Sequence, residues 1–186
     1  ARSRGIARIL RKADSLIWTG DGDDASKPTH AYGLKKSGCT AFAATGAKYE
    51  SATIADVILD AIAQAKAQGF AADVAIVPTA LEAQIRGLKD KNGNYLFNQV
   101  TGMLGQVRIV TSDQLGATEI VVADSSCCEI VDRGEYEMEL ERVADKDGWR
   151  VWLRKSFQVK VPAPEKKGII YVANVTTAIA AIAPAA

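Results

Sequence analysis

The sequence predicts an α+β fold, and three observations support that class. Segments 6–17 and 53–68 carry apolar residues at spacings of three and four, as on one face of a helix. Segment 73–77 is a short apolar run bounded by Pro78, which indicates a buried strand. Segment 135–161 alternates apolar and polar residues, as strands with one buried face do. Both helices and strands are therefore expected.

The composition is ordinary for a globular chain. Of its 186 residues, 48% are hydrophobic and 24% are charged, so the chain can bury a core as one domain or as two small lobes. It carries 23 Lys and Arg against 22 Asp and Glu, and this net charge of +1 gives no argument for nucleic acid, a membrane or an acidic substrate. No apolar run approaches the roughly 20 residues of a membrane span, so we expect no membrane partner.

The first helix is expected to end near Gly20. Basic residues lie off its apolar stripe or at the edge of it: Arg4, Arg8, Arg11 and Lys12. The stretch 20–38 that follows is rich in Gly, Asp and Ser, which indicates a loop. The chain begins at Ala1 without a methionine and enters the helical pattern at once, so we expect the full-length protein to have a further N-terminal segment.

Further elements are expected in the middle of the chain. The helix at 53–68 is expected to end at Gly69. Thr79 and Glu82 have the spacing of a capping box, in which each side chain satisfies a free amide at a helix start, and they predict a third helix over 80–88. The remaining expected elements are strands at 106–110 and 119–123, and a segment at 125–131 for which a short helix is favoured over a strand.

The alternating region predicts a long antiparallel hairpin. Glu occupies the odd positions from 135 to 141, apolar residues occupy the even ones, and Asp145 to Gly148 form the turn signal. If Asp145 faces Gly148, a single register places polar residues opposite each other on one face of the hairpin and apolar residues opposite each other on the other face. Its cross-strand pairs are Glu139–Arg154, Glu141–Trp152, Val143–Arg150, Leu140–Leu153 and Tyr136–Phe157.

The second hairpin strand also raises the possibility of a platform for single-stranded nucleic acid. Basic and aromatic side chains share its polar face: Arg150, Trp152, Arg154 and Lys160. The acidic face of the first strand lies beside them in the predicted register and offsets their field. We therefore favour exposed cross-strand ion pairs, each worth about 0 to 1 kcal/mol, and a structural hairpin.

The sequence contains no motif for catalysis, a metal or a cofactor. His30 is the one histidine, and no set of residues that could orient it as a base is marked around it. The cysteines lack the paired spacing of a zinc site or a disulfide framework and favour a reduced, intracellular setting: Cys39, Cys127 and Cys128. Gly20 to Gly22 follow a helix and lack the Lys-Ser/Thr of a phosphate loop, so a helix terminator is favoured. We predict no catalytic residue, no metal, no cofactor and no enzyme activity.

Segment 87–99, GLKDKNGNYLFNQ, begins like a calcium-binding loop. Its first, third and fifth ligands would be Asp90, Asn92 and Asn94. The match fails at Tyr95 and Thr101, which stand where an EF-hand needs glycine and glutamate. A tight turn at Asn92-Gly93 is favoured instead, because both residues tolerate positive φ.

Several motifs occur in a specific order along nearly the whole chain. The first motif is the first helix, followed by Thr19-Gly20-Asp21-Gly22 and Gly33-Leu34. The second is the strand and helix of 73–88, followed by LKDKNGNYLF. The third is Val131-Asp132-Arg133-Gly134, which precedes the alternating strands. Together they resemble the tailed-bacteriophage major capsid proteins of the Hong Kong phage type, a fold that encapsulin compartments also use. The three motifs are similar to that family's spine helix and its exit, its axial domain, and the entry into its peripheral hairpin.

The chain also departs from the family pattern. Residues 104–109 read LGQVRI where the family usually has GxPV. In self-crosslinking members an Asn and a catalytic Glu lie in the second hairpin strand; the matching places hold Trp152 and Val159, which cannot form an isopeptide bond. The family's N-terminal arm and its Lys-bearing extended loop would lie upstream of Ala1. The resemblance therefore implies a shell, or a fragment, that does not crosslink.

The resemblance implies a phage major capsid fold in two domains and a tail. A peripheral domain of spine helix and long antiparallel hairpin would span 1–46 and 133–172. An axial domain of mixed sheet plus helices would span 47–132, and a C-terminal tail would span 173–186.

The function implied is that of a structural head-shell subunit of a tailed phage or prophage. Copies of the full-length protein would form pentamers and hexamers and then an icosahedral shell that encloses DNA, which the subunit would contact only indirectly. The protein would be found in the virion capsid after assembly in the bacterial host cytoplasm. An encapsulin-like compartment is the alternative, and a nucleic-acid-binding module is less favoured. We expect this chain by itself to be a monomer or weak oligomer.

The resemblance also suggests which residues contact neighbouring subunits. The turn at 89–94 would point to the ring axis, and the turn at 145–148 would meet neighbours near threefold positions. The predicted inter-subunit contacts are Lys89, Asp90, Lys91, Asn92, Asn94, Asp145, Lys146, Asp147, Gly148, Arg4, Arg8 and Arg11.

Overall fold

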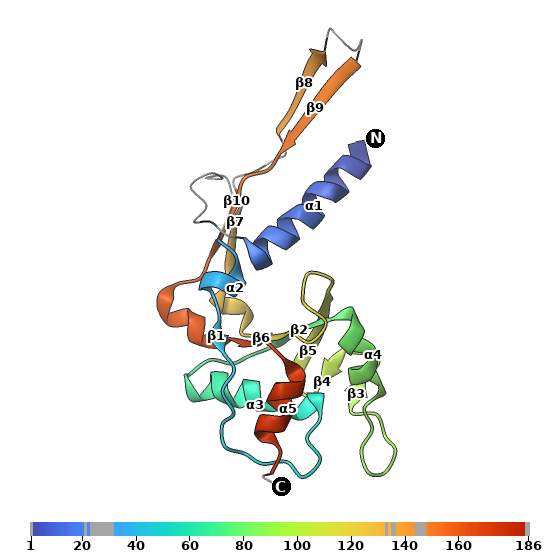
Figure 1. The fold of residues 1–186 in the computed structure, drawn as a ribbon, viewed down its shortest axis with the longest axis vertical. Helices are drawn as coiled ribbons and strands as arrows, with labels where there is room; N and C mark the ends of the chain where they lie inside the picture. The colour runs from blue at the N-terminus through green and yellow to red at the C-terminus, as the bar shows by residue number, and fades with distance from the viewer. Residues whose placement is uncertain are drawn as a thin grey trace. The chain divides into compact units, whose positions relative to one another are not determined.

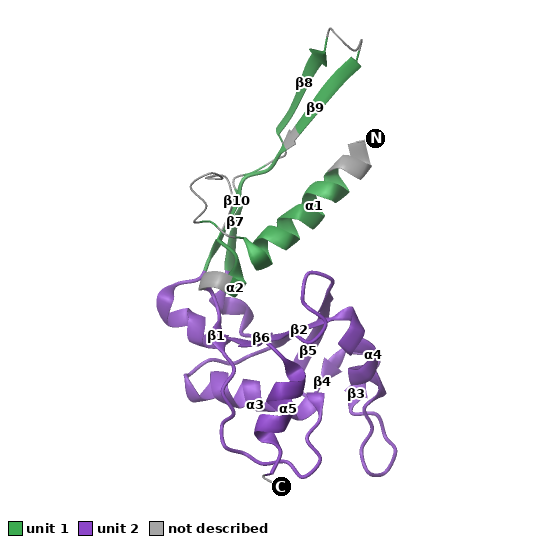
Figure 2. Ribbon diagram, in the orientation of Figure 1, with its two compact units in different colours: residues 1–37, 129–160 green, residues 38–128, 161–186 purple. Residues whose placement is uncertain are grey.

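Figure 2 shows the two units of the computed structural model. Unit 1 comprises Ala1–Ser37 and Glu129–Lys160, and unit 2 comprises Gly38–Cys128 and Val161–Ala186. The structure describes residues 2–20, 22, 32–132, 134, 137–143 and 148–184. The predicted domain boundaries lie at 46/47, 132/133 and 172/173, so they differ from these units. The assignment of peripheral and axial domains stays a prediction.

Unit 2 is built on a seven-stranded sheet with the order β1-β11-β6-β2-β5-β4-β3. Its strands are β1 (Thr40–Ala41), β2 (Val74–Pro78), β3 (Phe97–Asn98), β4 (Met103–Leu104), β5 (Val107–Ser112), β6 (Ile120–Ala123) and β11 (Ile169–Val172). The pairs β1–β11 and β2–β5 are parallel and the others are antiparallel, so the predicted mixed sheet is confirmed. The sheet forms one side of the core.

Three helices belong to unit 2: α3 (Ile54–Ala67), α4 (Thr79–Gly87) and α5 (Val175–Ile182), as Figure 1 shows. The predicted apolar stripe of α3 is buried, with Val57, Ile58 and Ala61 fully inaccessible to solvent. At the start of α3 the Asp56 carboxylate accepts hydrogen bonds from the amide of Thr53 at 2.8 Å and from its hydroxyl at 2.7 Å. Gly69, at a φ of 89°, follows the helix end as predicted.

The capping box predicted for α4 is wrong. The helix begins at Thr79, so Pro78 occupies the N-cap position, and no side chain caps the start of the helix. Glu82 instead pairs with Arg86 one turn later, with 2.6 Å between Arg86 Nη2 and Glu82 Oε1. The helix starts one residue earlier than the spacing suggested, directly after β2, which extends through Pro78.

The predicted C-terminal tail is largely a helix. Asn174 caps α5, since its Oδ1 accepts hydrogen bonds from the amides of Thr176 at 2.9 Å and Thr177 at 3.2 Å. Val175, Ala178 and Ile182 are buried in the core. A capping Asn followed by apolar residues at three- and four-residue spacing is a helix signal, but the low complexity of this alanine-rich end obscured it.

The helix favoured for 125–131 is wrong for most of that segment. A single 3₁₀ turn, η1 (Ser125–Cys127), is followed by β7 (Glu129–Asp132), which pairs antiparallel with β10 (Phe157–Lys160) in unit 1. A second 3₁₀ segment, η3 (Ala163–Gly168), leads from this region into β11. This segment is a strand because it pairs with a strand nearly thirty residues away. The local sequence pattern does not indicate that pairing.

Unit 1 begins with α1 (Arg2–Thr19), which ends as predicted before Gly20, and continues into α2 (Leu34–Ser37). The amide of Gly33 donates to the carbonyl of Gly20 at 2.8 Å. A Cβ atom on Gly33 would lie 2.4 Å from the Gly20 nitrogen and 2.6 Å from the Trp18 carbonyl oxygen. Close backbone approach therefore requires glycine at position 33.

The long hairpin is present, but its predicted register is wrong by two residues. Strands β8 (Glu137–Val143) and β9 (Gly148–Arg154) pair Glu139 with Trp152, Leu140 with Val151 and Val143 with Gly148. A shift of two keeps every side chain on its predicted face, so alternation could not distinguish the two registers. Tyr136 and the turn at 145–147 lie outside the described residues, whereas Phe157, the predicted partner of Tyr136, begins β10 and pairs with Asp132.

The apolar face of this hairpin is exposed, against the expectation of a buried face. Met138, Leu140, Trp149 and Val151 share that face, and Leu140 and Trp149 are 59% and 67% exposed. Among the described residues no element covers these side chains enough to bury them. The alternation therefore marks an apolar surface that this chain leaves open to solvent.

Candidate assembly surfaces

The turn at 89–94 is a hydrogen-bonded loop of unit 2 that extends beyond α4 (Figure 1). The Asp90 carboxylate accepts hydrogen bonds from the amides of Asn92 and Asn94 at 2.9 and 2.8 Å and from the Asn94 side chain at 3.1 Å. The Asp90 amide donates to the Asn94 carbonyl at 2.8 Å, and Gly93 has a φ of 84°. These contacts confirm the tight turn at Asn92-Gly93.

The Asp90 side chain holds the loop together through hydrogen bonds to Asn92 and Asn94. Hydrogen bonds from the Asn94 amide and side chain lower the pKa of the Asp90 carboxyl, because they stabilise its charged form. Its oxygens are thus used by the loop itself. Lys89 lies over the Tyr95 ring, with 4.7 Å between Nζ and the ring centroid. The loop presents backbone and cationic side chains outward.

The carboxylate of Asp90 is expected to titrate below the ordinary aspartate pKa of about 3.9. A lowered pKa in the folded state means that the loop is stabilised above the ordinary pKa and loses this contribution as the pH falls through the lowered value. An NMR titration that follows the Asp90 carboxyl carbon measures the midpoint. Asn94→Ala keeps the backbone donor and removes the side-chain donor, so it should move the midpoint upward; an unchanged midpoint in this variant would contradict the assignment.

The hairpin face opposite the apolar one carries cross-strand ion pairs, as predicted. Arg150 Nη1 lies 3.4 Å from Glu141 Oε2, and Arg154 Nη2 lies 3.3 Å from Glu139 Oε2. The Trp152 indole also donates to Glu141 at 3.3 Å. Arg154 reaches Glu139 diagonally, so this pair forms although the register differs from the prediction. These pairs offset the basic charge that a nucleic-acid platform would need.

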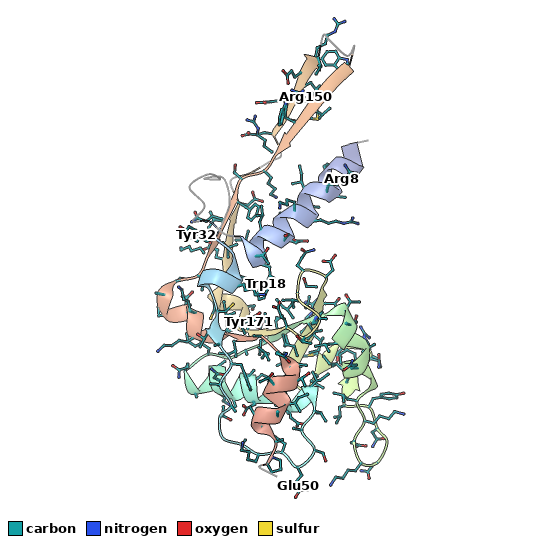
Figure 3. All side chains as sticks on the ribbon, viewed as in Figure 1. Arg8, Trp18, Tyr32, Glu50, Arg150 and Tyr171 are labelled. Carbon is teal, nitrogen blue, oxygen red and sulfur yellow. The ribbon has the colours of Figure 1, made fainter. Side chains whose placement is uncertain are left out.

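The other predicted contact residues are distributed over unit 1. Gly148 is the first residue of β9, whereas Asp145, Lys146 and Asp147 lie outside the described residues. Arg8 and Arg11 are exposed on α1, and Figure 3 labels Arg8. Arg4 also belongs to α1, but only its backbone is described. Their contacts with other subunits stay predictions.

Sequence reasoning missed three exposed apolar side chains beside the edge strand of the seven-stranded sheet. Tyr95, Leu96 and Val100 flank the edge strand β3 and are 57%, 46% and 94% exposed; we call these three residues the knob. Asn98 orders the turn that carries Val100, since its Oδ1 accepts from the amides of Val100 at 2.9 Å and Thr101 at 3.2 Å. Asn98 and Gly102, which are residue types typical of turns, are the sequence signal from which this turn could have been predicted.

At the opposite edge of the sheet lies an apolar groove of about 390 Å³. It runs between the segment that follows β1, the end of β11, and α5, and its lining includes Phe42, Ala44, Tyr171, Thr177 and Ala181; we call it the groove. Tyr171 is labelled in Figure 3, and its hydroxyl donates to Glu119 at 2.6 Å. Small side chains line much of it, which leaves room for an apolar group from outside.

No metal-binding group is assembled among the residues that the structure describes. None of their His, Cys, Asp and Glu side chains form a group of three that could hold a metal ion. Burial, and to a lesser extent the neighbouring Cys128, raises the pKa of Cys39 to about 12, so this thiol stays protonated at neutral pH. His30 lies outside the described residues. Within the described part of the chain, no helix combines the length and apolarity needed to cross a bilayer.

The fold is shared with proteins that form capsids and particles. A virus-like particle from Pyrococcus furiosus has 10% sequence identity and a TM-score of 0.58, over 88% of this chain and 63% of that chain. The capsid of the empty GTA particle has 17% identity and a TM-score of 0.66, over 92% and 64%. The protein of Microbacterium phage Oxtober96 has 15% identity and a TM-score of 0.65, over 89% and 61%. At these identities the likeness establishes the fold, and the chain spans less than two thirds of each of these proteins.

The chain therefore has the fold of these capsid and particle proteins. The sequence makes the assignment more specific, because the model of the phage capsid family matches residues 2–168. The chain belongs to the phage capsid family, as the motifs of the sequence implied. No curated protein matches the sequence.

Proposed function

We propose that the full-length protein is a structural head-shell subunit whose work is self-association into a closed icosahedral shell around DNA. The family match over residues 2–168 carries this proposal. The exposed apolar face of the hairpin supports it, because apolar surfaces of this kind commonly mark protein interfaces. The mechanism is geometric: heterologous contacts between identical copies close into rings, and the rings close into a sphere. No chemical step on a substrate is involved.

The two predicted contact turns supply contacts in this proposal. The turn at 89–94 would meet its copies around a ring axis, and the turn at 145–148 would meet neighbouring rings. DNA would be enclosed with little direct contact, after assembly in the host cytoplasm. The present chain spans 61% to 64% of the solved relatives described above, and we expect it alone to remain a monomer or weak oligomer, which light scattering would measure.

Electron microscopy of the full-length protein tests the proposal, and closed shells are the expected result. Lys89→Glu combined with Lys91→Glu should prevent shells without unfolding the monomer, because it reverses the charge of the turn at the proposed axis. Lys66→Glu reverses an exposed charge on α3 and serves as the control. Normal shells from the turn variant would contradict the contact assignment, and the absence of shells from the unmodified protein would contradict the function.

An encapsulin-like compartment is the second candidate, because a virus-like particle shares the fold. The contents of purified particles distinguish the two. Nuclease-protected DNA is expected for a phage shell, whereas a protein cargo would favour the compartment.

A further inference from the structure

The seven-stranded sheet ends at β1, and backbone groups beside this strand face away from the rest of the sheet. Phe42 follows β1, and its amide donates to the Tyr171 carbonyl in β11 at 2.9 Å. Successive residues of a strand direct their backbone groups to opposite sides, so the carbonyl of Ala41 and the amide of Ala43 point away from β11. Such an edge can pair with a strand of another chain.

The side chains of this edge do little to prevent such pairing. Residues 40–46 read TAFAATG, without the proline or charged side chains that commonly protect an edge strand. Ala41, Ala43 and Ala44 are exposed, and their small side chains leave the backbone accessible from outside. Protection of this edge therefore has to come from another element.

Gln64 of α3 lies against this side of β1. Its Nε2 donates to the Ala41 carbonyl at 3.1 Å, and its Oε1 accepts from the Ala43 amide at 3.0 Å. In a parallel ladder, one residue of the neighbouring strand makes the same pair of bonds, to a carbonyl and to the amide two residues further on. The Gln64 carboxamide therefore takes the place of one residue of an eighth strand.

Asp60 continues this arrangement along the same helix. Its Oδ2 accepts from the Thr45 amide at 3.0 Å, and the residue is 1% exposed. Four residues of a helix rise by about 6.0 Å, and two residues of an extended chain span about 6.6 Å. The spacing from Asp60 to Gln64 thus matches the spacing from Thr45 to Ala43. One face of α3 can follow the edge for this reason.

The helix that carries these two side chains is held firmly in unit 2. Val57, Ala61 and Ala65 of α3 are fully inaccessible to solvent, so the helix is packed into the core. The segment beyond Thr45 is also attached, since the Tyr49 amide donates to the Ile182 carbonyl at the end of α5 at 3.0 Å. The core of the folded chain therefore positions Gln64 beside β1.

We propose that Gln64 protects the β1 edge: its carboxamide occupies the position where another strand would add, and it prevents pairing of this sheet with a second copy of the chain. Loss of the carboxamide leaves the Ala41 carbonyl and the Ala43 amide unpaired and accessible. This protection acts in the unassembled chain and is independent of the proposed function.

Hydrogen exchange followed by NMR at low protein concentration tests the contact. Gln64→Leu keeps the approximate size of the side chain and removes both polar groups. The Ala43 amide should then exchange about two- to tenfold faster, as expected for the loss of one hydrogen bond. The Thr45 amide, which is bonded to Asp60, should change little and is the internal reference.

Sedimentation velocity of the same variants at increasing concentration tests the protection. Gln64→Leu should form larger species than the unmodified chain at equal concentration, because its edge can pair with another copy. Gln68→Leu makes the same replacement at an exposed position directly after α3 and controls for added apolar surface. This control should sediment like the unmodified chain.

Gln64→Ala covers the case in which leucine disturbs the helix. Alanine is the best helix former and adds no apolar bulk, so this variant should stay folded and should also associate. Gln64→Glu keeps an acceptor for the Ala43 amide and adds a charge at the edge, so it should remain as monomeric as the unmodified chain.

Each contrary outcome overturns a defined part of the inference. Unchanged exchange at Ala43 in both Gln64→Leu and Gln64→Ala would overturn the contact. Faster exchange without larger species would show that the contact is only structural and would overturn the protection. Equal association of Gln68→Leu and Gln64→Leu would assign the effect to apolar surface and would overturn it as well. Electron microscopy of shells tests the proposed function separately.

Discussion

Ile58→Ala is expected to lower the free energy of unfolding by about 2 to 5 kcal/mol, the usual cost of an empty site in a packed core. The Ile58 side chain is fully buried in α3 and belongs to the core formed with the sheet. Urea denaturation followed by circular dichroism measures the loss. The effect combines lost burial with a cavity that the surrounding strands and α5 can only partly fill.

Leu59→Ala provides the matched control, since Leu59 is the next residue of the same helix and is 48% exposed. Its replacement should change the free energy of unfolding by no more than about 0.5 kcal/mol, as exposed substitutions usually do. Similar losses at both positions would show that α3 packs on another face than the one described here.

Gly168→Ala is expected to destabilise unit 2 by about 1 to 3 kcal/mol, the usual cost of overpacking. A Cβ atom at this buried position would lie 2.4 Å from Cys127 Sγ and 2.9 Å from the Phe70 ring. Thermal unfolding measures the effect. Gly87→Ala is the control, because nothing lies within 4 Å of its Cβ position at the end of α4; it should be neutral or should stabilise by up to about 1 kcal/mol.

A double variant tests the cause of the Gly168 effect. Cys127→Ala removes the sulfur that the new methyl group would strike, so the loss in Gly168→Ala with Cys127→Ala should be smaller than the sum of the two single losses. Additive losses would show that the contact with Cys127 is not the cause, which leaves the Phe70 ring or the backbone.

Much of the fold could be predicted from local pattern. The helices α1 and α3, the strand β2 and the alternating hairpin follow from apolar spacing, because burial on one face imposes a period on the sequence. Predictions failed where contact with another element was decisive. The helix α4 follows β2 directly, so Pro78 takes the N-cap position in place of Thr79, and pairing with the distant strand β10 makes most of 125–131 a strand in place of the favoured helix.

The candidate surfaces were less predictable than the fold. The turn at 89–94 could be predicted from the residues Asn92-Gly93. The structure adds that the Asp90 carboxylate oxygens accept hydrogen bonds from within the loop. The exposure of Val100 was not visible, since a single valine between polar residues carries no period. The groove was also invisible, because its walls come from segments more than 120 residues apart, around Phe42 and Tyr171.

The sequence by itself determined the main helices and strands, the turn at 89–94 and membership of the phage capsid family, because spacing and motif order are properties of neighbouring residues. The tertiary structure alone decided the hairpin register, the order of the seven strands and the positions of the knob and the groove. These depend on pairing between distant segments, and a shift of two residues or a change of partner strand leaves every local pattern intact.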